Sequence, residues 1–249
     1  MSERNKHGLT RDIPSGVKLE VRKRSGFGCV ICGSALYTYE HIDPPWAEAK
    51  EHRVEGITLL CDRHQRKKTT GFLAAQTVKD AMESPKCLRD GFAWEEFEFG
   101  SGNITIRFAG QEIAYTPWPF VIRDTPILVI EPPESIGGPF RLSAVFNDEL
   151  GKPSLTIIRN EYKVFSGNWD VEARGGTVIV RHQKRHIGLK LKMEPPNRFV
   201  VQKIMALYGN VLLVGDPDTL RIVDPKTGKA RSLFQGMRIS HCPIGIHLA

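Results

Sequence analysis

Two segments decide how this chain folds: Cys29-Val30-Ile31-Cys32-Gly33 and Leu60-Cys61-Asp62-Arg63-His64-Gln65. Each supplies a pair of metal-ligating side chains, two cysteines in the first and a cysteine with a histidine in the second. Three thiolates and one imidazole in this spacing are typical of a closed, tetrahedral zinc site. The sequence therefore predicts a structural zinc ion bound by Cys29, Cys32, Cys61 and His64, and a small domain whose folding depends on it.

Two further cysteines, Cys87 and Cys242, lie outside these segments. Cys87 is near enough in the sequence to be an alternative fourth ligand, which would free His64 from the zinc. The chain has five cysteines. An odd number, with three in one metal-like cluster, does not resemble the disulfide framework of a secreted protein.

The residues between the two cysteine segments predict a short hairpin. Leu36–Tyr39 alternates and is rich in strand-forming residues, and Glu40 and His41 stand at its end. Ile57–Leu60 predicts the second strand. The basic stretch that begins at Asp62 then predicts a helix, so the zinc ligands would flank a unit of two strands and one helix.

This arrangement, with an acid and a histidine between two pairs of zinc ligands, resembles the HNH endonuclease family over about residues 13–90. The resemblance implies an α+β domain of the zinc-stabilised ββα-metal fold. It also implies that His41 is the general base that activates water for attack on a DNA phosphodiester. Glu40 and the residue after the last zinc ligand, Gln65, would hold Mg²⁺ or another divalent cation.

The sequence departs from the family pattern at two positions. The family has an asparagine where this chain has Gly56, and a histidine or asparagine where it has Gln65. A glycine has no side chain to orient the base, and a neutral amide is a weaker metal ligand than imidazole. His52, in the intervening loop, is a candidate to replace the missing ligand or orienting group.

Two functions follow from this pattern. The first is a metal-dependent DNA endonuclease with a variant site. The alternative is a catalytically inactive, zinc-stabilised nucleic-acid-binding or scaffold protein, whose β-rich half recognises a partner or forms a homo-oligomer. A purely structural protein, in which zinc only holds the fold, is a third possibility and would show no salt-dependent affinity for DNA.

The charge distribution favours an anionic partner. The chain has a net charge of +7 and a pI near 9.2. Basic residues gather on both sides of the predicted metal site and are candidates for contact with the DNA backbone. They are Lys18, Arg22, Lys23, Arg24, Arg63, Arg66, Lys67 and Lys68.

The composition changes after the metal-binding region. We expect a flexible arm at residues 1–12, the HNH-like domain at 13–90, a linker at 91–102 and an all-β domain at 103–249. Apolar runs in the last part begin 22 residues apart, at Leu155, Thr177 and Phe199. This recurrence favours a short parallel β-solenoid, with a β-sandwich as the alternative.

Two other features of the chain bear on its partners and its location. His182, Lys184, Arg185 and His186 form a small basic turn, which is either an exposed loop or a contact with a partner. No apolar run approaches the roughly 18 residues that span a bilayer, and the polar N-terminus has no signal-peptide core. The sequence thus predicts a cytoplasmic protein without a membrane partner.

Overall fold

The computed structural model describes residues 3–248, which form two compact units. Unit 1 consists of Met1–Glu95 together with the later segment Phe165–Val171. Unit 2 consists of Glu96–Val164 and Glu172–Ala249. The chain therefore leaves unit 1, builds part of unit 2, and returns to unit 1 for one short segment.

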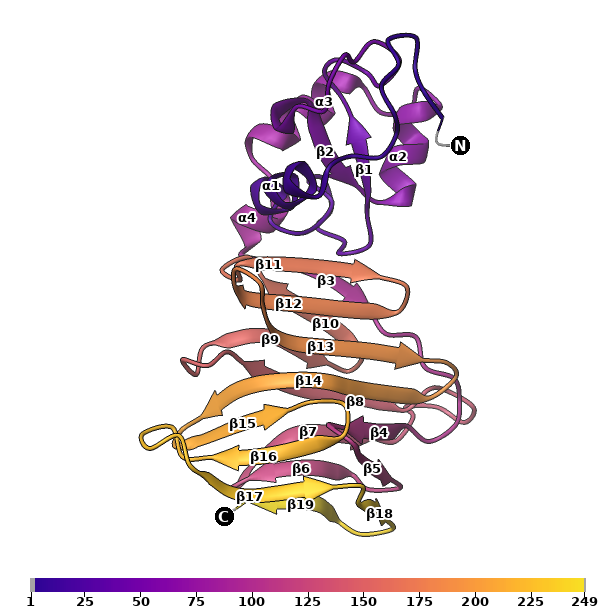
Figure 1. The fold of residues 1–249 in the computed structure, drawn as a ribbon. Coiled ribbons are helices and arrows are strands. Elements are labelled where there is room, and N and C mark those ends of the chain that lie inside the picture. Colours follow the sequence, from indigo (N-terminus) through magenta and orange to yellow (C-terminus); the bar gives the residue numbers. More distant parts are fainter. Residues whose placement is uncertain (1–2, 249) are drawn as a thin grey trace. The chain divides into compact units, whose positions relative to one another are not determined.

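Unit 1 contains all the helices of the described chain and a small hairpin (Figure 1). Its helices are α1 (Ser15–Ser25), the 3₁₀ helix η1 (Val54–Gly56), α2 (Asp62–Thr69), α3 (Ala75–Glu83) and α4 (Lys86–Asp90). Its strands are β1 (Thr38–His41) and β2 (Ile57–Leu60), which pair antiparallel, while β3 (Phe92–Glu96) crosses the boundary to unit 2. The strand at 57–60 and the helix from Asp62 lie where the sequence predicts them.

Two apolar clusters hold unit 1 together. Val21 of α1 packs with Ile57 and Leu59 of β2, and all three side chains are buried. On the other face, Leu60 packs with Val78 of α3 and with the cysteines of the metal cluster. The alternation of β2 side chains between its two faces thus places one strand at the centre of both clusters.

Residues 3–12, within the stretch where the sequence predicts an arm, make contacts with the rest of unit 1. Met1 and Ser2 lie outside the described residues. The side-chain amide of Asn5 donates to the carbonyl oxygens of Trp46 and Ala49, at 2.5 and 2.7 Å. Arg4 and Thr10 form an antiparallel bridge. Within the stretch 91–102, where the sequence predicts a linker, Phe92–Glu96 form β3.

Unit 2 is built from strands alone. The first group is β4 (Thr105–Phe108), β5 (Gln111–Ala114), β6 (Trp118–Ile122), β7 (Thr125–Glu131), β8 (Arg141–Asn147), β9 (Pro153–Ile158) and β10 (Glu161–Phe165). The second group is β11 (Asp170–Arg174), β12 (Thr177–Gln183), β13 (His186–Glu194), β14 (Arg198–Tyr208), β15 (Val211–Gly215), β16 (Thr219–Val223), β17 (Ala230–Gln235), β18 (Arg238–Ser240) and β19 (Ile244–Leu248).

The strands of unit 2 form two open sheets. One contains the run β19-β6-β7-β8-β9-β10, and the other contains the run β12-β13-β14-β15-β16-β17. Strands that follow one another in these runs pair antiparallel, apart from the parallel pair of β19 with β6. The expected parallel β-solenoid is therefore wrong, because tight turns return the chain beside the preceding strand.

The two sheets of unit 2 face each other (Figure 1), and aromatic side chains are buried between them. Phe108 of β4 stacks on Phe120 of β6 with ring centroids 4.7 Å apart, and both are fully buried. The Tyr208 hydroxyl of β14 donates to the carbonyl oxygen of Val145 in β8 at 2.7 Å. Facing sheets are the arrangement of the β-sandwich alternative, and they explain why the apolar residues of each strand occupy alternate positions.

Candidate functional site

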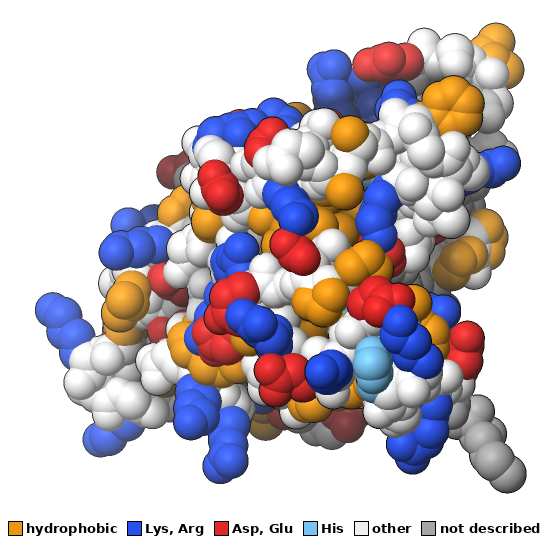
Figure 2. All heavy atoms as spheres, turned by 90° about the horizontal axis from the view of Figure 1, so that it is seen from above, with side chains coloured by type: hydrophobic (Ala, Val, Ile, Leu, Met, Phe, Trp, Pro, Cys, Tyr) orange, Lys and Arg blue, Asp and Glu red, His pale blue; other side chains and the backbone are white. Residues whose placement is uncertain are grey.

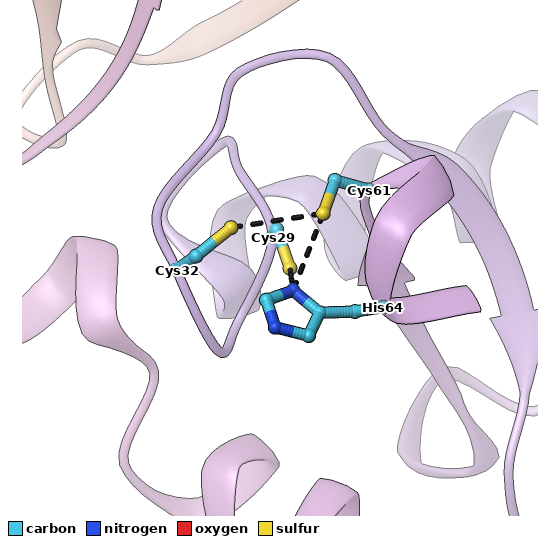
Figure 3. Close-up of side chains that lie close together, drawn as sticks. All are labelled: Cys29, Cys32, Cys61 and His64. Atoms are coloured by element: carbon cyan, nitrogen blue, oxygen red, sulfur yellow. Dashed lines mark hydrogen bonds between the residues drawn. The ribbon is translucent and has the colours of Figure 1, made fainter. Parts of the chain in front are cut away.

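The four expected zinc ligands come together in unit 1. Cys29 and Cys32 lie in the loop after α1, Cys61 immediately precedes α2, and His64 lies in the first turn of that helix. Figure 3 shows the three sulfurs and the imidazole pointing toward one another. The ligand atoms all lie within 4.8 Å of one another. Cys29 and Cys61 are buried, whereas Cys32 and His64 are partly exposed.

The distances within this cluster fit a tetrahedral zinc ion. Zinc–sulfur bonds of about 2.3 Å place two sulfurs about 3.8 Å apart, and a sulfur and a nitrogen about 3.6 Å apart. Cys32 Sγ and Cys61 Sγ are separated by 3.7 Å. His64 Nδ1 lies 3.5 Å from Cys29 Sγ and 3.2 Å from Cys61 Sγ. The donor set and its spacing therefore suit a structural zinc ion.

The pKa values of the three thiols favour a bound cation. The hydrogen bond from Cys32 lowers the pKa of Cys29 to about 4, whereas the same bond raises the pKa of Cys32 above its ordinary value. Burial also raises the pKa of Cys61. One thiolate thus opposes ionisation of its neighbours, and the two positive charges of a divalent ion offset most of that opposition.

Cys87, the alternative ligand, lies outside the cluster. Its sulfur is 3.9 Å from the carbonyl oxygen of Cys29 and packs under the loop that carries the first cysteine pair. Burial raises the pKa of Cys87 to about 12, so the group stays a neutral thiol. His64, not Cys87, is the fourth member of the only metal-ligating group found among residues 3–248.

The residues expected at the catalytic site form two separate contacts, one at Glu40 and the other at His41, which are neighbours on β1. Glu40 faces α2, where its carboxylate accepts hydrogen bonds from Gln65 Nε2 at 3.2 Å and from Lys68 Nζ at 2.6 Å. Lys68 Nζ also lies 3.4 Å from the carbonyl oxygen of His41. Both carboxylate oxygens are therefore engaged, and an ammonium group occupies the position where the resemblance implies a divalent cation.

His41 contacts His52, which the sequence predicts as a replacement for the missing ligand or orienting group. His41 Nε2 lies 3.1 Å from His52 Nδ1, with the ring centroids 5.2 Å apart. His41 is buried, and burial followed by the neighbouring His52 lowers its pKa below the ordinary value of 6.5. Burial likewise lowers the pKa of His52. Both imidazoles are therefore neutral near pH 7.

The backbone leaves no room for a side chain at Gly56, the position where the resemblance implies an asparagine. A Cβ atom at this position would lie 2.3 Å from the carbonyl oxygen of Asp43, closer than any side chain tolerates. The carbonyl oxygen of Gly56 accepts a hydrogen bond from Ile42 N at 2.8 Å. The backbone at Asp43 lies too close to Gly56 to admit any side chain there. A group that orients His41 therefore has to come from elsewhere in the chain.

Most of the expected DNA-binding cations have intramolecular partners. Arg22 is 7% exposed and donates to Asp170 and to the Tyr39 hydroxyl, so its assignment as a phosphate contact is corrected. Lys23 Nζ lies 4.3 Å from the ring centroid of Trp169. Lys18 Nζ lies over the Tyr39 ring, and Arg24 donates to the carbonyl oxygen of Val54.

The remaining cations lie on α2. Arg63, Arg66 and Lys67 line a depression with the exposed ring of Phe72, and the structure records no ion pair for these three cations among residues 3–248. On the face shown in Figure 2, lysine and arginine side chains are interspersed with acidic and apolar ones. Arg63, Arg66 and Lys67 therefore bring three cations together on the helix that carries His64.

The contact between Lys68 and Glu40 is the feature of the site that sequence analysis missed. Lys68 was assigned to the DNA-binding set because of its charge alone. Gln65 and Lys68 are three residues apart, and residues at that spacing share one face of a helix. This periodicity is the signal that would have placed both side chains opposite Glu40.

Comparisons with family models, with curated proteins and with solved structures give no match to this chain. Among the described residues, no helix is long and apolar enough to cross a membrane.

Proposed function

We propose that unit 1 hydrolyses phosphodiester bonds of nucleic acid, with His41 as general base and His52 as the group that orients it. The observation that carries this proposal is the 3.1 Å contact between His41 Nε2 and His52 Nδ1. The resemblance to HNH endonucleases supports it, because His41 ends the first strand of a hairpin whose following helix carries a zinc ligand.

The neutral state of His41 suits a base. In the tautomer in which His41 Nε2–H donates to His52, Nδ1 of His41 keeps its lone pair for a water proton. The water oxygen then forms a bond to phosphorus while the bond to the leaving sugar oxygen breaks. Because burial lowers the pKa of His41, the unprotonated form dominates near pH 7.

The residues around Glu40 do not fit a resident divalent ion. One carboxylate and one amide are a small ligand set, and the Lys68 ammonium already lies 2.6 Å from the carboxylate. We therefore assign no step to a catalytic metal. The positive charge beside His41 comes from Lys68, whose side chain is 21% exposed.

A second candidate function is nucleic-acid binding without cleavage. The same ion pair favours it, since Glu40 is neutralised by Lys68 and the depression beside Phe72 carries cations without ion-pair partners among the described residues. A nucleic-acid base can stack on an exposed aromatic ring, and Arg63 or Arg66 can contact the phosphate backbone, without any catalytic residue. In this reading, unit 2 recognises a partner.

A plasmid-cleavage assay distinguishes the two functions. The full chain is incubated with supercoiled DNA in EDTA, Mg²⁺, Mn²⁺ or Ni²⁺, beside His41→Ala and the control His7→Ala, whose side chain lies in an exposed N-terminal segment. Nicking lost only in His41→Ala supports hydrolysis. Zinc-loaded protein that binds DNA but never nicks it leaves the binding module as the function.

A further inference from the structure

The outer face of α2 carries a depression that neither the zinc cluster nor the His41–His52 pair uses. Gln65 and Lys68 turn toward the hairpin, where both contact Glu40. With 3.6 residues per turn, the opposite face of the helix carries residues spaced by three, four and seven positions. They are Arg63, Arg66, Lys67 and Thr70, which line an open depression of about 740 Å³ together with Asp62 and Phe72.

The backbone at Phe72 is fixed, although its ring is exposed. Gly71 turns the chain after α2 with a positive φ of 80°. The N–H of Phe72 donates to the carbonyl oxygen of Lys67 at 2.8 Å, and the next residue, Leu73, packs against the buried cluster around the zinc ligands. The side chain of Phe72 is nevertheless 85% exposed. Unit 1 thus holds a large apolar ring in water at a defined position.

The depression carries an excess of positive charge. Arg63, Arg66 and Lys67 are exposed, and no ion pair is recorded for them in the part of the chain that the structure describes. Asp62 is the one acidic residue among the six that line the depression. It lies in the first turn of α2, where the helix dipole stabilises a carboxylate. The three cations therefore remain available to an anion from outside the chain.

We propose that this depression binds a single-stranded stretch of nucleic acid, an inference that rests on nucleic acid being the substrate proposed above. One base stacks on Phe72, while Arg63, Arg66 and Lys67 contact the neighbouring phosphates. Bases inside a duplex stack on one another and cannot cover a protein ring, so the base at Phe72 has to be unpaired. The substrate is therefore a single strand, or a duplex with an unpaired region.

The stacked base is not at the bond that is cut. An α-helix with its side chains is about 10–12 Å across. The depression lies on one side of α2, and Glu40, which precedes His41 on β1, contacts the other. A strand held at Phe72 therefore has to pass around the helix before one of its phosphates reaches His41, and the depression anchors nucleotides that flank the scissile bond.

A membrane surface and an acidic protein are the competing partners for a basic helix with an exposed aromatic ring. A helix that binds a membrane buries a whole apolar face, whereas Phe72 is the one apolar residue among the six of the depression. An acidic protein segment pairs with the cations but carries no base for the ring. A ring set among cations is the arrangement by which proteins bind single strands, so the same features favour nucleic acid.

The test is fluorescence anisotropy of a labelled oligodeoxythymidylate and a labelled hairpin duplex, titrated with the full, zinc-loaded chain. We expect the wild type to bind the single strand more tightly than the duplex. Phe72→Ala should weaken single-strand binding about tenfold and leave duplex binding unchanged, whereas Phe72→Trp should retain both. The control Leu36→Ala removes an apolar side chain that is 53% exposed and lies outside the depression, and it should bind like the wild type.

The salt dependence of binding separates the ring from the cations. Each phosphate contact contributes about −0.7 to the slope of log K against log salt for a single strand. Arg66→Ala should therefore make the slope shallower by about 0.7, whereas Phe72→Ala should lower the affinity without changing the slope. Lys50→Ala, which removes an exposed cation from the loop between β1 and η1, is the control and should change neither quantity.

Three results would overturn the proposal. The first is a wild-type chain that does not bind the single strand. The second is an equal loss of affinity in folded Phe72→Ala and Leu36→Ala. The third is a requirement for Phe72 in binding to anionic vesicles or poly-glutamate but not to the oligonucleotide, which would assign the depression to a membrane or an acidic protein.

The outcome for this site is separate from the outcome for hydrolysis, because the titration measures binding alone and is repeated in His41→Ala. A chain that binds the single strand through Phe72 but never cuts it contradicts the proposed hydrolysis and supports the site. A chain that nicks plasmid DNA yet shows no binding that depends on Phe72 contradicts the site alone.

Discussion

Arg22 and Asp170 form a bidentate ion pair across 148 residues of sequence, with Nε and Nη2 of the guanidinium 2.7 and 2.8 Å from the two carboxylate oxygens. Their side chains are 8% and 2% exposed. Burial is the largest single influence and opposes the charge of Arg22, but the hydrogen bonds that Arg22 donates to Asp170 and Tyr39, together with the charges of these two groups, raise the pKa of the guanidinium overall. The pair ties the segment Phe165–Val171 to α1 within unit 1.

Arg22→Ala should destabilise unit 1 by about 3–5 kcal/mol, because it leaves the Asp170 carboxylate buried and unpaired. Urea denaturation measures the loss. The neighbouring substitution Arg24→Ala removes a cation whose hydrogen bond goes to a partly exposed carbonyl, and should cost less than about 1 kcal/mol. Equal losses in the two variants would contradict a special role for the buried pair.

Removal of the zinc ion should unfold unit 1 and leave the sheets of unit 2 intact. The helices lie in unit 1, so a chelator should abolish the helical circular dichroism while the strand signal remains. Cys61→Ser should reproduce the effect. Cys87→Ser should retain one zinc per chain, and its failure to do so would make Cys87 a ligand.

The His41–His52 pair predicts how stability depends on pH. The native pKa of each imidazole is lowered from 6.5, so the unfolded state takes up protons first as the pH falls. Their contribution to stability is fully present above about pH 6.5 and is lost as the pH falls through the native pKa values. Urea denaturation from pH 8 to pH 5 measures it, with a flatter profile expected for the double substitution His41→Asn, His52→Gln.

Lys68→Ala should raise the affinity of Glu40 for a divalent cation. The substitution removes the ammonium that lies 2.6 Å from the carboxylate, and the Gln65 amide, which donates from Nε2 in the wild type, can then turn its oxygen toward the cation. Electron paramagnetic resonance should detect Mn²⁺ bound in Lys68→Ala but not in the control Lys67→Ala. Binding in the wild-type chain that Glu40→Gln abolishes would show that Lys68 does not exclude the ion.

Gly56→Asn, which introduces the residue that the resemblance implies, should destabilise the hairpin. The new Cβ would lie 2.3 Å from the carbonyl oxygen of Asp43, so the hairpin has to open, at a cost of about 1–3 kcal/mol or more. Gly71→Asn is the matched control, since no atom lies within 4 Å of its Cβ position and asparagine tolerates a positive φ. Thermal denaturation compares the two, and an unchanged Gly56→Asn would rule out the clash.

Local patterns in the sequence were enough to predict the metal cluster, the strand before it and the helix after it. Two residues separate Cys29 from Cys32, and two separate Cys61 from His64. Within each pair, this spacing lets both ligand atoms reach one ion, whatever the rest of the chain does. The strand at 57–60 and the helix from Asp62 follow from residue preferences over a few positions. Each of these features depends on contacts within a short stretch of chain.

The remaining features depend on contacts between distant residues. Apolar runs 22 residues apart recur in a solenoid and in a meander alike, because periodicity does not reveal whether the next strand returns antiparallel. Likewise, nothing in the residues that surround Asp170 in the sequence indicates that its partner is Arg22. The sequence shows that Arg22 is charged but not that it is buried, so charge alone wrongly predicts a contact between Arg22 and DNA.

The return of Phe165–Val171 to unit 1 has a consequence for biosynthesis. The ribosome releases the zinc ligands early, but Asp170 emerges only after most of one sheet of unit 2 has been made. Until then the guanidinium of Arg22 has no carboxylate to join it. The N-terminal unit is therefore completed late in translation, and a fragment that ends at residue 95 would carry the whole metal cluster yet lack the segment that closes its fold.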